Sequence, residues 1–146
     1  MSLPMTQPDA QPVQARFKHE NGTQLRLQCF LAIRDAQGRA ATVRVQGIEG
    51  WCIPAESMYL NESPEQAAVR VARMWFQTPL GVQLDRIVSF PATGPEDDRW
   101  YLVFVFHADA PANLVGTPDT LEIKFRGKDE AAPFAMSHAD VWPHLW

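Results

Sequence analysis

The chain has 146 residues, of which 46% are apolar and 21% charged, a composition typical of one globular domain with a buried core. The formal net charge is −4 and no block of Lys and Arg occurs, which argues against a surface that coats nucleic acid. The sequence contains neither the run of about 18 apolar residues that a membrane span needs nor an apolar export signal, so we expect a cytoplasmic protein.

The N-terminal segment is rich in Pro and Gln. Residues 1–20 are therefore predicted to be disordered, because such a composition buries too little apolar surface to offset the entropy of ordering. We assign the folded domain to residues 21–146, in which no internal repeat is visible.

Two strands and a tight turn open this domain. Residues 24–34 alternate and then become continuously apolar, and residues 40–46 alternate again, which predicts a hairpin with one buried face. The sequence between them is a turn signal, with Gly38 available for a positive φ. In the loop over residues 47–62, a short extended piece is expected from Trp51 to Pro54.

A helix follows this loop. Ser63 is a predicted N-cap, Pro64 suits the first helical position, and Gln66 completes a capping box. The helix is expected to continue to about Gln77, before the Pro and Gly of the next four residues stop it.

Strands dominate the rest of the chain. Aromatic and β-branched residues make 100–108 the most strand-like stretch. Further strands are expected at 82–90 and 121–125, and a short C-terminal helix with Ser137 as N-cap at 137–146. Because strands and helices interleave, the pattern predicts an α/β layered domain with a mixed sheet.

The order of these parts, together with two short motifs, resembles the Nudix hydrolase family over roughly residues 23–145. The lead-in Trp51-Cys52-Ile53-Pro54 matches the family's Trp, any residue, hydrophobic, Pro. Glu62 and Arg70 stand at the right distance from each other to match the first Glu and the Arg of the Nudix motif. The resemblance implies an α/β/α sandwich with a mixed β-sheet.

The other motif positions differ from the family pattern. The Glu that follows the Arg is Val71 here, and the Glu-Glu pair is Met74 and Trp75. Glu56 and Gln77 replace the opening and closing Gly. In the family, these Glu side chains line one face of a helix and hold Mg²⁺ or Mn²⁺, which activate water against a bound diphosphate. Val, Met and Trp cannot bind these cations, so the resemblance favours a protein that is inactive by the usual mechanism.

Two interpretations of the apolar substitutions stay open. In one, the former metal-binding face contacts a nucleotide-like ligand or a partner, and the candidate ligand-binding residues are Trp51, Val71, Met74 and Trp75. In the other, the helix is simply buried on two faces and binds nothing. For Glu62 and Arg70 we favour a structural ion pair, which fixes the loop to the helix, over a role in catalysis.

An active enzyme with relocated carboxylates is the alternative function. It would be a Mg²⁺- or Mn²⁺-dependent hydrolase that cleaves a nucleoside diphosphate linked to another moiety. Its weak metal-binding candidates near the helix start are Glu56, Glu62 and Glu65, and a further acidic group lies at residues 96–98. A purely structural or dimerising domain is a third hypothesis, since the resemblance also suggests a homodimer.

Cysteine and histidine residues give little support to other chemistry. Cys29 and Cys52 lie in apolar surroundings and are interpreted as buried, reduced thiols rather than a disulfide. None of the four histidines has a zinc-like spacing to them, so a structural zinc site is not expected.

Overall fold

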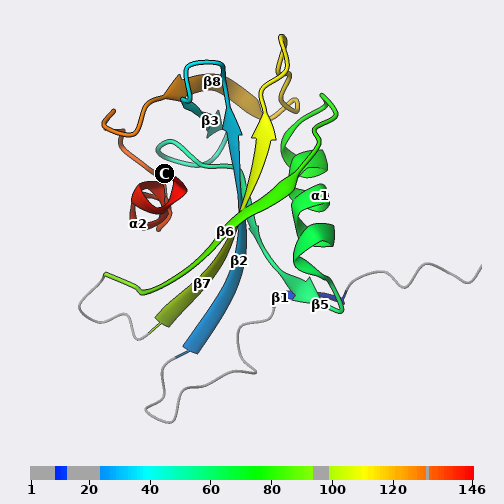
Figure 1. Ribbon diagram of the computed structural model, residues 1–146, viewed down its shortest axis with the longest axis vertical. Coiled ribbons are helices and arrows are strands. Elements are labelled where there is room, and N and C mark those ends of the chain that lie inside the picture. Colours follow the sequence, from blue (N-terminus) through cyan, green and yellow to red (C-terminus); the bar gives the residue numbers. More distant parts are fainter. Residues whose placement is uncertain (1–8, 13–23, 94–98, 131) are drawn as a thin grey trace, which may run out of the picture.

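The computed structural model describes residues 9–12, 24–93, 99–130 and 132–146. Within these residues the chain forms one long helix, a short helical segment near its end, and a set of strands that alternate with them (Figure 1). The elements in chain order are β1 Asp9–Pro12, β2 Gln24–Arg34, β3 Ala40–Val45, β4 Ala55–Ser57, β5 Tyr59–Leu60, α1 Pro64–Trp75, β6 Gln83–Pro91, β7 Arg99–Asp109, β8 Thr120–Arg126, α2 His138–Val141 and the 3-10 helix η1 Trp142–Leu145.

The central sheet is mixed, as the sequence predicts. Its strands lie in the order β6-β7-β2-β3-β8, and β4 pairs with β2 beside β3. The pairing of β2 with β7 is parallel along their full length, and the other pairings in this sheet are antiparallel. The predicted β2–β3 hairpin is confirmed, and Gly38 has a φ of +76° in its turn, a conformation that glycine adopts without strain.

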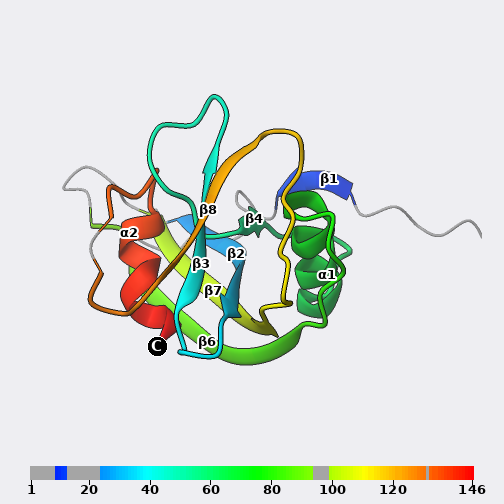
Figure 2. The same cartoon turned by 90° about the horizontal axis from the view of Figure 1, so that it is seen from above.

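The sheet carries a helical cover on each side, and Figures 1 and 2 show α1 and α2 on opposite sides of it. Alternating residues of β2 explain the two layers, because successive side chains of a strand point to opposite faces. Cys29, Leu31 and Ile33 pack against α1, whereas Phe30 and Ala32 pack against Val141, Trp142 and Leu145 of the C-terminal segment. The expected α/β/α sandwich is therefore the observed architecture.

Two segments are more ordered than the sequence predicts. Residues 9–12 lie in the segment predicted to be disordered, yet they form β1, which pairs antiparallel with β5. The remainder of residues 1–20 lies outside the described residues. The loop over residues 47–62 contains β4 and β5 in addition to the expected extended piece at Trp51. In both cases the segment becomes a strand because its backbone pairs with a distant segment, which local composition does not predict.

The ends of both helices also differ from expectation. Helix α1 ends at Trp75 rather than near Gln77, because Phe76 turns to an extended conformation and bridges to Gly116. The C-terminal helix is only four residues long and continues as a 3-10 turn that contains Pro143, whose missing N–H cannot extend an α-helix. Ser137 is the N-cap residue of α2, as predicted, but its side chain makes no capping hydrogen bond.

Within the described residues, none of the helices combines the length and the apolar character that a membrane span requires.

Candidate functional site

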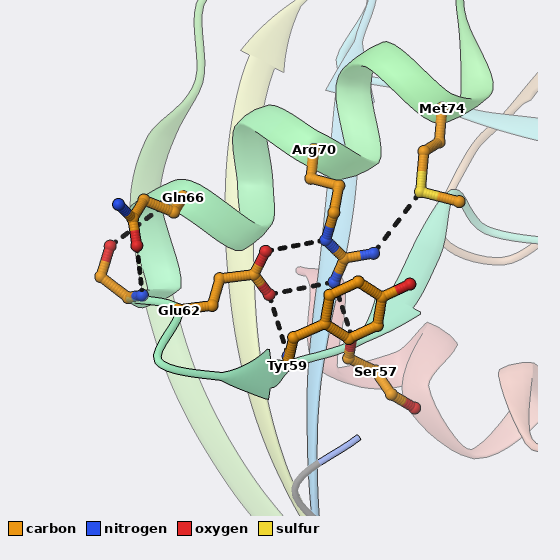
Figure 3. A network of polar contacts seen from close by, with 7 residues as sticks. Ser57, Tyr59, Glu62, Gln66, Arg70 and Met74 are labelled. Atoms are coloured by element: carbon orange, nitrogen blue, oxygen red, sulfur yellow. Dashed lines mark hydrogen bonds and ion pairs between the residues drawn. The ribbon is translucent and has the colours of Figure 1, made fainter. Parts of the chain in front are cut away.

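The start of α1 is fixed by the predicted capping box. The Gln66 backbone N–H donates to Ser63 Oγ at 3.1 Å, and the Ser63 backbone N–H donates to Gln66 Oε1 at 2.9 Å (Figure 3). Pro64 occupies the first helical turn, where its missing N–H leaves no bond unmade. These local interactions fix the position of the residues that come before and after the cap, which form the candidate site.

Glu62 and Arg70 form the expected ion pair, and its geometry is bidentate. Arg70 Nε donates to Glu62 Oε2 at 2.8 Å, and Arg70 Nη2 donates to Glu62 Oε1 at 3.0 Å (Figure 3). The Glu62 side chain is only 1% exposed, and that of Arg70 16%. The hydrogen bond and charge of Glu62 raise the pKa of Arg70 even though burial opposes the charged form.

The same pair holds the preceding loop against the helix. Glu62 Oε1 also accepts from the Tyr59 backbone N–H at 2.9 Å, and Arg70 Nη2 donates to the Ser57 carbonyl at 2.7 Å. The guanidinium carbon lies 3.7 Å from the centre of the Tyr59 ring. Sequence analysis missed Ser57 and Tyr59, because a backbone carbonyl and a loop aromatic carry no motif of their own. Both oxygens of Glu62 are thus committed to protein donors.

The three apolar residues at the family's Glu positions lie in different environments. Val71 has no exposed surface and packs in the core beneath α1. Trp75 is half-buried at the edge of that core, and Met74 is 47% exposed, with its sulfur 3.4 Å from Arg70 Nη1. A ligand on the surface can therefore reach Met74 and Trp75 but not Val71, for which the buried-helix interpretation holds.

Glu56 lies next to these residues. It is half-buried on β4, and its carboxyl group lies close enough to the Trp75 side chain for Trp75 to lower its pKa. Burial raises the pKa of Glu56, although Trp75 and the charge of Arg70 act in the opposite direction. Glu65, in the first turn of α1, is exposed. Unlike Glu62, Glu56 forms no ion pair with any residue that the structure describes.

The donor atoms on this part of α1 do not fit Mg²⁺ or Mn²⁺. Such cations need several oxygen ligands, whereas Val71, Met74 and Trp75 offer none and Glu62 is held by Arg70. Across the described ranges, no three or more His, Cys, Asp or Glu side chains are grouped closely enough to hold a metal ion. The acidic group at 96–98 lies outside the described residues.

Trp51 lies elsewhere. It is buried at the other side of the sheet, where its backbone pairs with Phe134 and its ring faces Arg126 at 4.5 Å and Arg44 at 5.7 Å. The structure therefore separates Trp51 from the other three predicted ligand-binding residues. Sequence analysis could not place Arg126 on Trp51, since the contact joins a strand end to a distant loop.

The thiols and the buried histidine are structural groups. Cys29 and Cys52 are free and buried, as predicted, and burial raises the pKa of Cys29 to about 12. His138 Nδ1 accepts a hydrogen bond from the Ile53 backbone N–H at 2.8 Å, and burial lowers its pKa to about 4. Its imidazole is neutral near pH 7 and fixes α2 to the segment after Trp51.

Comparison of the structure with solved proteins connects this geometry to known folds. A Nudix hydrolase from Mycobacterium smegmatis, RenU, is 20% identical with a TM-score of 0.59, and the alignment covers 88% of this chain and 89% of that one. The chain has the Nudix fold. An ADP-ribose pyrophosphatase from Streptococcus suis is 16% identical with a TM-score of 0.58, covering 82% and 86% of the two chains. The Nudix domain of Shewanella oneidensis NrtR, solved with ADP-ribose, is 13% identical with a TM-score of 0.58, covering 88% and 90%.

No protein-family model matches the sequence, and no curated protein does either. The Nudix fold is thus visible in the architecture, while the three solved proteins share only 13–20% sequence identity with this chain.

Proposed function

We propose that this Nudix-fold chain binds a nucleotide-like small molecule and does not hydrolyse it through helix α1. The observation that carries the proposal is the chemistry of α1 at the positions of the family's glutamates. Val71 is in the core, and Met74 and Trp75 offer a thioether and an indole to the surface. These groups bind no divalent cation, but they suit contact with a planar ring.

The neighbouring side chains support binding of a base or a ribose rather than of bare phosphate. The Glu56 carboxyl group beside Trp75 is a hydrogen-bond acceptor, and the positive charge of Arg70 is already neutralised by Glu62. The ADP-ribose bound to the Nudix domain of NrtR makes ADP-ribose the first compound to try.

The test measures binding and hydrolysis of the same compounds. Purified protein is mixed with ADP-ribose, nucleoside triphosphates, nucleotide sugars and dinucleoside polyphosphates, each with Mg²⁺, Mn²⁺ or EDTA. We expect at least one compound to raise the thermal unfolding temperature in EDTA, with no turnover under any condition. Failure of every compound to bind would contradict the proposal and favour a structural or dimerising domain.

Substitution of Trp75 localises the binding. Loss of base stacking costs about 1–3 kcal/mol, so Trp75→Ala should weaken binding by about 5- to 150-fold. Trp100→Ala is the matched control, because Trp100 is 40% exposed on β7. Equal affinities for the two variants would show that the ligand does not use α1.

A hydrolase with relocated carboxylates remains the second candidate, and Glu56 is the observation that favours it. Its pKa is raised and no described residue forms an ion pair with it, two properties that suit a general acid or base. Metal-dependent turnover that disappears in EDTA and falls by about 10²–10⁴ in Glu56→Gln would support this function over the first.

Two further properties belong to the proposal. Free buried thiols are typical of a reducing compartment, which supports a cytoplasmic location. The resemblance to Nudix proteins suggests a homodimer, and light scattering on the purified protein would measure its mass.

A further inference from the structure

Arg126 is a buried cation on the face of the sheet opposite α1. It is 7% exposed, its Nε donates to Thr42 Oγ1 at 3.1 Å, and its guanidinium carbon lies 4.5 Å from the centre of the Trp51 ring. The Thr42 hydroxyl in turn donates to the Lys124 carbonyl, so the position of the guanidinium is fixed by a chain of contacts. Because the guanidinium is already held in one position, it loses little conformational freedom when it binds a ligand.

The Arg126 guanidinium has no counter-ion among the residues that the structure describes. Within the described residues no carboxylate forms an ion pair with Arg126, and Glu130 instead accepts from the Gly127 backbone N–H at 2.9 Å. Nη1 and Nη2 of Arg126 donate to no acceptor among the described residues. Neither atom is completely buried, so both can contact solvent. The Trp51 ring stabilises the positive charge of Arg126 only in part, and Nη1 and Nη2 remain able to donate hydrogen bonds to a ligand.

The surrounding strand face is also positive. Residues two apart on a strand share a face, so Lys124 projects on the same side of β8 as Arg126, and Arg44 of β3 lies on that side as well. Arg44 is paired with Glu122 at 3.4 Å, whereas Lys124 is exposed and forms no ion pair with the described residues. Arg126 and Lys124 thus place two positive charges on this strand face that form no ion pair with the described residues.

We propose that Arg126, with Lys124 beside it, binds a small oxyanion of the phosphate class. Two parallel Nη donors match two oxygens of such a group, and burial against Trp51 makes the hydrogen bonds stronger than at an open surface. This site is separate from the surface around Met74 and Trp75, so it does not depend on the function proposed for α1.

The test uses inorganic phosphate as the probe. Thermal unfolding of the wild-type protein is followed in sodium phosphate, sodium acetate or sodium chloride at one constant ionic strength and pH 7. We expect a saturable rise of the unfolding temperature in phosphate that chloride and acetate do not reproduce. Arg126→Gln should weaken this response at least about tenfold. Arg39→Gln, the same change at an exposed arginine that pairs with Asp35, should keep the wild-type response.

Two measurements keep the test valid if Arg126→Gln fails to fold. Lys124→Gln alters only an exposed side chain and should weaken phosphate binding several-fold. In the wild-type protein, the NMR signal of the Arg126 Nε–H should shift saturably with phosphate. A wild-type protein that responds equally to phosphate and chloride, or an equal loss in Arg39→Gln, would overturn the proposal. A response to acetate as strong as that to phosphate would overturn the choice of phosphate.

Discussion

The two halves of helix α1 differ in what they preserve of the Nudix pattern. The first half, from Ser63 to Arg70, has a complete capping box and a bidentate ion pair with Glu62. The second half, from Val71 to Trp75, has apolar side chains where the family has carboxylates. In this chain the first half fixes the loop to the helix, whereas Val71, Met74 and Trp75 of the second half offer no oxygen ligand for Mg²⁺ or Mn²⁺.

The contrast between the two halves of α1 is tested by placing Glu, the residue of the Nudix motif, at position 71. Val71 is fully buried, so Val71→Glu places a carboxyl group in the core without a partner. We expect the free energy of unfolding to fall by about 4–5 kcal/mol, measured by urea denaturation. Met74→Glu makes the same kind of change at a site that is 47% exposed, and should alter stability by no more than about 0.5 kcal/mol. Similar losses in both variants would show that the two sites do not differ as described.

The first half is tested by removing one partner of the ion pair. Arg70→Ala leaves the Glu62 carboxylate buried and unpaired and removes the bond to the Ser57 carbonyl, so we expect a loss of about 3–4 kcal/mol in urea denaturation. The double variant Glu62→Gln with Arg70→Ala should be more stable than Arg70→Ala alone, because no buried charge remains. A loss below about 1 kcal/mol in Arg70→Ala, as for an exposed pair, would contradict the structural role.

Helix α2, on the face of the sheet opposite α1, is tested by measuring stability as a function of pH. The folded pKa of His138 is about 4, below the ordinary value of 6.5, so the unfolded chain binds this proton more tightly. The contribution of His138 to stability is therefore complete above pH 6.5 and is lost as the pH falls from 6.5 to about 4, up to about 3 kcal/mol. His138→Asn keeps an acceptor for the Ile53 N–H but does not titrate. The stability difference between wild type and variant should shrink or reverse toward pH 4, and a pH-independent difference would contradict this account.

The sequence predicted correctly those features that depend on residues close to one another in the chain. The capping box at Ser63 and Gln66 and the turn at Gly38 were correct, because each depends on residues a few positions apart. The strands β2 and β7 were placed within one residue, since alternation and β-branched side chains mark them directly. The ion pair of Glu62 and Arg70 was expected from the resemblance to the Nudix motif, in which these two residues orient the loop and the helix.

The features that sequence analysis missed are contacts between distant segments. Nothing near Asp9 signals that residues 9–12 pair with β5. The stacking of Arg126 on Trp51 joins the end of β8 to a loop far away in the sequence. The difference in burial between Val71 and Met74 depends on which face of the helix contacts the sheet. Such contacts are set by tertiary packing, for which a single sequence has no periodic signal.

The parallel pairing of β2 with β7 has a consequence for how the chain folds. Gln24 pairs with Arg99 and Arg34 with Asp109, so the central ladder joins the beginning of the domain to a strand that follows β6. The β2–β3 hairpin needs only a short turn and can form within microseconds. The central ladder must first close a long loop, which raises the contact order and slows folding. During synthesis this edge of β2 lacks its partner until β7 has been made, and an unpaired strand edge is prone to aggregation.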